Sequence, residues 1–373
     1  MLLVFSLPQG DSAGQRNHYE RGVDYSPMAL EVNELSSLAA LEGRRSDYQD
    51  VFSRSDEKDI FLEMSWITNW WRVYGEGRKM HVLEVLDEGR PAGYAPFMIS
   101  SIGKVLKIRI LEFIGTGPSD RLAVLAEEGR RDVHEAIWRH LDSEGRWDVM
   151  DLRDMREGGS TIGGMLEHFP SAEREMSKAP FIPILGGFDD YMYSLSSNVR
   201  RSLNSLWRRF IKDHGVEFHA YQRPEDMDFC YRTLMELNAL RWKSRGESTL
   251  ASEQMREFVR RTVETFAPRG QIMFHMLTVK HVPVAVTYGF LHNNRYLYYL
   301  SGFNPEYSAY GPGKTLLTEI IKDCYDKGYY EMDFLRGGED YKYSFNPIDR
   351  DMYRIRVSGR SLRGNLSDKL RKS

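Results

Sequence analysis

The best candidate for binding a charged ligand in this chain is the stretch between Tyr298 and Lys342. The stretch reads as a strand, a glycine-containing turn, an amphipathic helix, a second strand and a polar tail. The turn carries Gly311 and Gly313 at the start of the expected helix. Such a turn presents backbone N–H groups and the positive end of a helix to an anion. The stretch therefore predicts a site for a phosphate-bearing ligand.

Three interpretations of this turn are open. Gly313-Lys314-Thr315 matches the end of a nucleotide-binding P-loop, but Ser308 stands where that motif requires its first glycine. Gly-Pro-Gly is also common in tight turns that bind nothing. The third interpretation is a cradle for the pyrophosphate of coenzyme A. The order of elements favours this last one, because a hairpin and a third strand precede the turn and a helix and a strand follow it.

This order is that of the GNAT acyltransferase core, and residues 198–343 resemble the acetyltransferase domain of CelD/BcsL-type proteins. Those proteins are GNAT-superfamily members associated with bacterial cellulose and exopolysaccharide synthesis, and they are similar to the FemAB/FemX transferases. The resemblance rests on the runs Y-S-A-Y-G-P-G-K-T-L-L, M-D-F-L-R-G-G and G-E-D-Y-K. It implies acetyl-CoA or another acyl-CoA as co-substrate, without a metal. The residues expected to bind this co-substrate are Ser301, Ser308, Tyr310, Gly311, Gly313, Lys314 and Thr315.

The first half of the chain repeats the element order of the second half. Pro91 in the first hairpin corresponds to Pro283, and Asp151 corresponds to Asp333. A repeat of this length indicates duplicated domains. We expect an α/β protein of tandem GNAT-like domains with mixed, mostly antiparallel sheets. Its parts are a loose tail (1–28), a degenerate N-terminal domain (29–180) and a C-terminal acyltransferase domain (181–373).

The N-terminal counterpart of the glycine turn lies in Phe113–Leu125 and contains Gly115 and Gly117. It does not lead straight into a helix as the C-terminal turn does. We therefore expect the N-terminal half to form one wall of a cleft and not a second active site.

Three residues after the helix are candidates for catalysis. Asp333 lies in an apolar strand, where burial can raise the pKa of a carboxyl group enough for it to serve as a general base. The alternative is a structural carboxylate that accepts backbone hydrogen bonds. Tyr341 is placed to protonate a leaving thiolate, and Lys342 to hold a substrate carboxylate or phosphate. Both follow Gly337 in a loop that is otherwise interpreted as solvated.

Other polar residues are candidates for binding the acceptor. These are Asn238, Arg241, Trp242 and Glu339. A cationic cap at a helix C-terminus is the alternative interpretation of Arg241. The run Arg200–Lys212 is locally basic and reads by default as a solvated amphipathic helix. The second interpretation of this run is contact with a phosphorylated acceptor or an anionic membrane surface.

Composition excludes several classes of protein. With 373 residues and a net charge of −3, the chain is long enough for two domains and is not expected to bind nucleic acid. Two cysteines form neither a disulfide framework nor a Cys-rich zinc site, and the histidines show no metal-binding spacing. No apolar run is long enough to span a membrane. We expect a cytoplasmic protein, with the inner-membrane surface as a peripheral site.

These observations predict an acyltransferase. It moves an acyl group, expected to be acetyl, from acyl-CoA to an amine or hydroxyl of a cell-envelope or exopolysaccharide precursor, by direct attack in a ternary complex. One alternative is a FemAB-like peptidyltransferase that uses aminoacyl-tRNA. The other is a non-catalytic scaffold associated with polysaccharide synthesis machinery. Two departures from the usual GNAT loop support the scaffold: Ser308 replaces a Gln or Arg, and Pro312 removes one backbone N–H.

Overall fold

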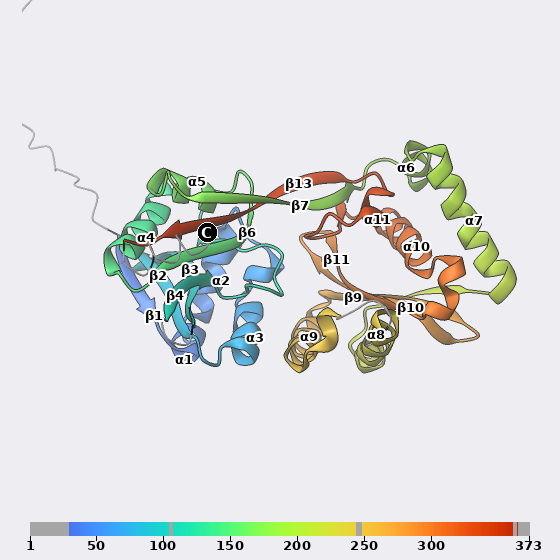
Figure 1. The fold of residues 1–373 in the computed structure, drawn as a ribbon, viewed down its shortest axis with the longest axis horizontal. Coiled ribbons are helices and arrows are strands. Elements are labelled where there is room, and N and C mark those ends of the chain that lie inside the picture. The colour runs from blue at the N-terminus through green and yellow to red at the C-terminus, as the bar shows by residue number, and fades with distance from the viewer. Residues whose placement is uncertain (1–29, 104–106, 244–247, 361–363, 365–373) are drawn as a thin grey trace, which may run out of the picture.

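The computed structural model describes residues 30–103, 107–243, 248–360 and residue 364; the expected N-terminal tail lies outside these residues. The described strands form one mixed sheet with helices on both faces (Figure 1). Along the sheet the order is β1-β2-β3-β4-β6-β13-β7-β12-β11-β10-β9-β8, and the short β5 pairs with β3. This arrangement confirms the predicted tandem GNAT-like α/β fold.

The N-terminal half runs from residue 30 to residue 183. Its elements are β1 (Glu31–Leu35), α1 (Leu38–Glu42), α2 (Arg45–Arg54), η1 (Ile60–Leu62), α3 (Met64–Tyr74), β2 (Lys79–Asp87), β3 (Arg90–Ile102), β4 (Ile108–Phe113), β5 (Leu125–Ala126), α4 (Arg131–Glu144), β6 (Val149–Arg156), α5 (Ser160–His168) and β7 (Glu173–Pro183).

The C-terminal half begins at residue 188 with two helices that have no counterpart in the first half, and from residue 217 onward it repeats the order of the first half. Its elements are α6 (Phe188–Ser194), α7 (Ser197–His214), β8 (Glu217–Tyr221), η2 (Pro224–Asp226), α8 (Met227–Trp242), η3 (Thr249–Ala251), α9 (Glu253–Phe266), η4 (Ala267–Arg269), β9 (Ile272–Val279), β10 (Val282–His292), β11 (Arg295–Phe303), η5 (Pro305–Tyr310), α10 (Pro312–Lys327), β12 (Glu331–Asp333), α11 (Asp340–Tyr343) and β13 (Ile348–Ser358).

The two halves exchange their last strands. β13, from the C-terminal half, pairs antiparallel with β6 and β7 and so fills the space between them. β7, from the N-terminal half, in turn lies between β13 and β12. Figure 1 shows the two long strands crossing side by side from one half to the other. Neither sheet half is therefore complete without a strand of the other, and the boundary predicted at residue 180 falls inside β7.

Two hydrophobic cores lie on the two faces of the C-terminal sheet. One core, between the sheet and α6, α7 and α10, contains Phe210 and Leu317. The other continues from the N-terminal half into the face that α8 and α9 cover. Trp66 on α3 joins the halves in this second core. Its ring lies 4.9 Å from that of Phe258 and 5.6 Å from that of Phe290, both edge to face.

The predicted elements differ from the structure in places. The hairpins β2–β3 and β9–β10, the strands that follow them and helices α4 and α10 are confirmed. Strand β8, between helices α7 and α8, was not predicted. Four further strands, β1, β5, β7 and β13, were not predicted. Polar side chains alternate with apolar ones along β13, and that alternation is the missed signal of a strand.

Candidate functional site

A continuous cleft runs along β11 in the C-terminal half. A cavity of about 300 Å³ lies at the N-terminus of α10, and a second cavity of about 460 Å³ adjoins it. Arg241, Tyr298, Ser301 and Tyr341 line both cavities, so we treat them as one cleft. Its two ends are called the α10 end and the α11 end below.

The cleft exists because β11 separates from its neighbour. β11 pairs in parallel with β12 only from Arg295 to Leu297. Beyond that point its register with β10 shifts, and Tyr299 has no opposite residue. A bulge of this kind re-aims backbone and side chains. The backbone amides after Leu297 therefore border the cleft without a partner strand on the β12 side. The corresponding strand β4 pairs regularly with β3 along its whole length.

The glycine turn forms the α10 end of the cleft. Ser308, Gly311, Gly313 and Lys314 line it, and Ser301 lines it from β11. Gly311 has a φ of 56°, a left-handed conformation that glycine adopts without strain. Pro312 then fixes the first turn of the 16-residue helix α10. The N-terminus of α10 therefore borders the cleft, as an anion site requires.

Two residues predicted to bind the co-substrate do not line the cleft. Tyr310 stacks on Phe210 with ring centroids 5.0 Å apart, and its hydroxyl donates to the Asp213 carboxylate at 3.2 Å. The hydroxyl of buried Thr315 donates to the Tyr310 carbonyl at 3.1 Å. Both side chains therefore hold the turn in shape, and this geometry favours a positioning role for them.

Arg241 is the main cation in the middle of the cleft. Its Nη1 donates to Ser301 Oγ at 2.7 Å, and its guanidinium lies 5.5 Å from the ring of Trp242 and 5.2 Å from that of Phe303. No carboxylate of the described chain pairs with it. Arg241 can therefore bind an anionic group or a carbonyl oxygen of a ligand. Trp242 lines the same part of the cleft.

Asn238 connects α8 to β11. Its Nδ2 donates to the Ser301 carbonyl at 2.8 Å, and its own backbone packs against Gly302. A Cβ at Gly302 would lie 2.4 Å from the Asn238 nitrogen, so only glycine permits this approach. Asn238 borders the cleft, but these bonds favour a positioning role over direct acceptor binding.

The polar tail closes the α11 end of the cleft. Lys342 is buried, and its Nζ donates to the carbonyls of Arg336 and Gly337 at 3.0 Å each and pairs with Glu339 at 2.8 Å. These bonds hold the loop instead of leaving Lys342 available to a substrate. Burial raises the pKa of the Tyr341 hydroxyl, and the nearby Tyr298 acts in the same direction. Tyr341 therefore keeps its proton and can donate it.

Asp333 lies outside the cleft, fully buried below it. One of its oxygens accepts from Arg121 and, at 3.0 Å, from Arg350, and the other accepts from the Leu335 N–H at 2.7 Å. Both oxygens are thus occupied, so the geometry favours the structural interpretation over the general base. Its counterpart Asp151 accepts likewise from Arg354, at 2.7 Å.

We expect Asp333→Asn to cost stability and not catalysis. The substitution keeps the shape but removes the buried charge that pairs with Arg121 and the half-buried Arg350, and breaking a buried pair costs about 3–5 kcal/mol. Urea unfolding should show this loss as a lower midpoint with unchanged slope. A variant of normal stability with strongly reduced turnover would instead restore Asp333 as the base.

The N-terminal half supplies a carboxyl group to the cleft. Gly117, Pro118 and Asp120, in the loop after β4, line its α11 end. This lining agrees with the prediction that the N-terminal half forms one wall of the cleft, but Asp120 was not among the predicted residues. The loop between β4 and α4 carries no local signal of its contact with a strand almost two hundred residues away; only the full fold reveals it.

Asp120 shares one cation with a second carboxylate. Arg336 binds both oxygens of Asp154 at 2.7 Å, whereas its distance to Asp120 is 3.3 Å. Burial raises the pKa of Asp120 from 3.8 to about 7, and Asp154 adds to this effect while Arg336 opposes it. One guanidinium cannot neutralise two buried carboxylates, so the more weakly bound one holds a proton near neutral pH. Asp120 can therefore exchange a proton with a group in the cleft.

The structure contains neither a metal cluster nor a spanning helix in its described part. Among residues 30–103, 107–243 and 248–360, no three His, Cys, Asp or Glu side chains gather as metal ligands. No helix within these ranges is both long and apolar enough to cross a membrane.

Comparisons with known proteins agree with the fold. Residues 197–343 match the family model described as acetyltransferase (GNAT) domain. No curated protein sequence matches the chain. FemX superposes with a TM-score of 0.58 and 9% identity, over 87% of this chain and 96% of that one. L-PGS from Bacillus licheniformis superposes with a TM-score of 0.54 and 12% identity, over 85% and 93%.

A third solved structure extends this likeness. The C-terminal domain of a putative lysylphosphatidylglycerol synthetase from Agrobacterium fabrum superposes with a TM-score of 0.51 and 12% identity, over 90% of this chain and 97% of that one. Such low identities establish a common fold alone. The chain is thus similar in fold to FemX and L-PGS over nearly its whole length, and part of its second half matches the model of a GNAT acetyltransferase domain.

Proposed function

We propose that this protein transfers an acyl group from acyl-CoA to an amine or hydroxyl in the cleft along β11. The observation that carries the proposal is the course of the cleft. It begins at the N-terminus of α10, follows the separated strand β11, and ends at Asp120 and Tyr341. Along the cleft an anion site comes first, then a channel, and then a side chain that can take up a proton. In this order they suit the pyrophosphate of acyl-CoA, its thioester arm and the molecule that receives the acyl group.

The donor would bind with its pyrophosphate at Gly311–Lys314. Two features of the turn suit this role: the free N–H groups at the start of α10 and the charge of Lys314. The channel beyond is largely apolar, with Val286, Phe303 and Leu316 in its wall. Such a wall suits the pantetheine arm, which carries no charge. Pro312 removes one N–H, so the remaining amides and Lys314 bear the phosphate contact.

The chemistry would be direct attack on the thioester. The acceptor nitrogen or oxygen forms a bond to the carbonyl carbon, the carbon–sulfur bond breaks, and the acceptor's proton passes to Asp120. Backbone amides of β11 beyond Leu297 would stabilise the carbonyl oxygen as it gains charge. Tyr341 would protonate the leaving thiolate, since its raised pKa keeps the hydroxyl neutral.

The acceptor would occupy the α11 end, where both halves meet. Charged groups face this part of the cleft from both sides: Arg241 and Glu339 from the C-terminal half and Asp120 from the N-terminal half. Trp242 adds a ring that can stack on a sugar or a planar group. A polar, mixed-charge wall of this kind fits a saccharide or peptide acceptor. We therefore retain a cell-envelope or exopolysaccharide precursor as the proposed acceptor class.

Thermal shift with acetyl-CoA tests the donor. A ligand that binds only the folded state raises the melting temperature, by an amount set by its concentration over Kd. We expect a saturable rise that Gly313→Asp abolishes, because the new carboxylate would face the pyrophosphate. Gly313→Ala is the matched control, since a Cβ there meets only Phe303, at 3.9 Å. No rise with millimolar acetyl-CoA or longer acyl-CoAs would refute an acyl-CoA donor.

A FemAB-like transferase that uses aminoacyl-tRNA is the second candidate. The likeness to FemX over 87% of this chain favours it. α7 also presents the cations Arg201, Arg208 and Lys212 to solvent beside the glycine turn, and no ion pair to them is found among the described residues. Titration with charged and uncharged tRNA separates the two donors. Tight, Gly313-dependent binding of acyl-CoA combined with no preference for charged tRNA would exclude this candidate.

A further inference from the structure

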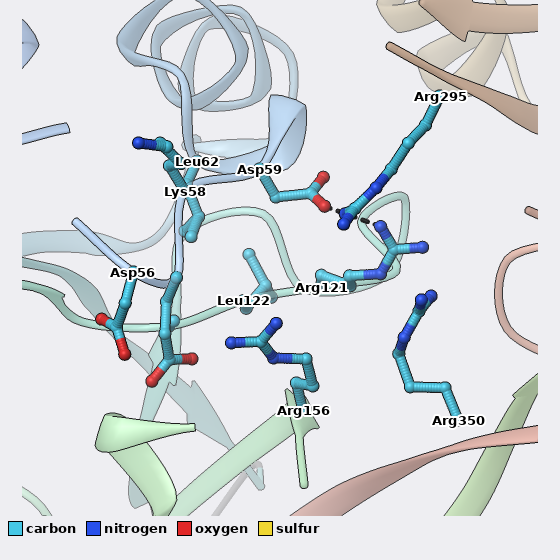
Figure 2. Close-up of a pocket in the computed structure, with 11 residues that line it drawn as sticks. Asp56, Lys58, Asp59, Leu62, Arg121, Leu122, Arg156, Arg295 and Arg350 are labelled. Atoms are coloured by element: carbon cyan, nitrogen blue, oxygen red, sulfur yellow. Dashed lines mark hydrogen bonds and ion pairs between the residues drawn. The ribbon is translucent and has the colours of Figure 1, made fainter. Parts of the chain in front are cut away.

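A second polar pocket lies where the two halves meet, away from the cleft. It encloses about 40 Å³ and is shown in Figure 2. Five cationic side chains line it: Lys58, Arg121, Arg156, Arg295 and Arg350. Arg121 and Arg156 come from the N-terminal half, Arg295 from the start of β11, and Arg350 from the exchanged strand β13. Figure 2 shows the four arginines coming from separate elements, whereas the Lys58 amine points away from them.

Three of the arginines are already paired with carboxylates. Arg121 binds Asp59 at 2.7 Å and also contacts Asp333. Arg350 binds both Asp333 and Glu331 at 3.0 Å. Arg295 lies 3.5 Å from Glu331. These three guanidinium groups and three carboxylates therefore balance one another in charge, and they fix the walls of the pocket.

Arg156 is different. Its guanidinium has no hydrogen bond or ion pair within the described part of the chain, although Glu57 lies close enough to sense its charge. Burial raises the pKa of Glu57, and its carboxylate accepts from the Thr161 N–H at 2.6 Å. Glu57 is therefore directed to the start of α5 and not to Arg156. Arg156 lines the pocket, and in Figure 2 its guanidinium lies below Leu122, between the Asp56 side and the other arginines.

A second, independent observation points to a missing partner. Arg121 is 7% exposed, and its Nε is buried without any hydrogen-bond acceptor. Buried donors are nearly always paired, so such a group calls for an unseen acceptor. The pocket thus combines a guanidinium with all donors unused and a buried N–H without an acceptor. Lys58 does not share this need, because its Nζ donates to the Ser53 carbonyl at 2.8 Å.

We propose that this pocket binds a single tetrahedral oxyanion, either inorganic phosphate or the phosphate group of a larger ligand. Arg156 would supply the main contact through its planar fork of N–H donors, and Arg121 a further donor. The pocket is small, about 40 Å³, and a single tetrahedral group suits that size. Because residues of both halves line the pocket, an anion there would hold the halves together. This proposal is independent of the acyl donor, whose site lies at the glycine turn.

Calorimetric titration with phosphate at constant ionic strength tests this site. We expect saturable binding of one phosphate per chain and a raised melting temperature. Arg156→Gln should weaken binding at least about tenfold, since it removes the guanidinium fork. Arg156 holds no structural bond, so the variant should keep its fold and its affinity for acetyl-CoA. Arg295→Gln is a second variant, expected to weaken binding to a smaller extent.

Arg208→Gln is the matched control, because it removes the same charge from the exposed face of α7. Equal loss in Arg156→Gln and Arg208→Gln would mean unspecific attraction and would overturn the proposal, as would no saturable binding to the unmodified protein. A parallel titration with glucose 1-phosphate separates the two sources of the anion. Tighter binding of the ester indicates a larger ligand, and binding of phosphate alone indicates the free ion. Gly313→Asp should leave both results unchanged.

Discussion

Asp120→Asn is expected to lower kcat for acyl transfer by about 10²–10⁴-fold, the usual contribution of a positioned general base. Asparagine keeps the shape of the side chain and can still bond to Arg336, but it cannot accept a proton from the acceptor. The proposed donor site lies at the other end of the cleft, so Kd for acetyl-CoA should stay unchanged. Single-turnover kinetics and calorimetry on the same variant measure the two quantities separately.

The pH dependence gives this prediction a second measurement. Since the pKa of Asp120 is raised to about 7, kcat/KM should rise with pH and level off above pH 7, once the carboxylate is ionised. The Asn variant should lose this rise. Asp228→Asn is the control, as the side chain of Asp228 is 79% exposed on α8. Full turnover with an unaltered profile in Asp120→Asn would place the base elsewhere.

The same group should make stability depend on pH. The folded protein holds the Asp120 proton up to about pH 7, whereas the unfolded chain releases it near its ordinary pKa of 3.8. Between these values the folded state binds more protons, so the free energy of unfolding falls as pH rises through this window. Asp120→Asn cannot titrate and should show a flatter dependence there. This readout does not require an acceptor.

The sequence indicated the repeat and the donor end of the cleft because both depend on local signals. Gly311, Pro312 and Gly313 are required by the backbone of the turn itself, and hairpins and helices follow short-range periodicity. Five of the seven residues predicted to bind the co-substrate line the cleft. Ser308, Gly311, Gly313 and Lys314 lie around the start of α10, and Ser301 lies on β11. Tyr310 and Thr315 are also in the turn, but their side chains face α7 and the backbone.

The acceptor end depends on long-range contacts, which residue spacing does not encode. Asp120 belongs to the N-terminal half yet faces the C-terminal cleft. Asp333 was a candidate base because an acid in an apolar strand has two explanations, and only the positions of Arg121 and Arg350 distinguish them. Lys342 likewise looked available until its carbonyl partners were known. A local sequence pattern can therefore predict a ligand site made of backbone groups. It is a poorer guide to which carboxylate serves as a base, because that depends on distant residues.

The exchange of strands leads to the second prediction with a large effect: residues 30–187 alone should not fold cooperatively. In the full chain β13 fills the space between β6 and β7, and its Met352 and Ile355 are completely buried. Without β13, two strand edges lose their hydrogen-bond partners. Each lost buried side chain also costs about 1.5–3 kcal/mol. That sum is a large share of the roughly 5–15 kcal/mol that stabilises a domain.

A redesigned fragment provides the matched control. β7 and β13 are antiparallel neighbours, and Phe181 near the end of β7 lies opposite Ile348 at the start of β13. Joining residues 30–181 to residues 348–360 through an Asn-Gly turn would therefore make a hairpin of the two strands in their native register. This version should unfold in one sharp urea transition by circular dichroism, whereas residues 30–187 should unfold gradually or aggregate. Equally sharp transitions in both would show that the N-terminal half needs no strand from its partner, and that the exchange only connects two self-sufficient domains.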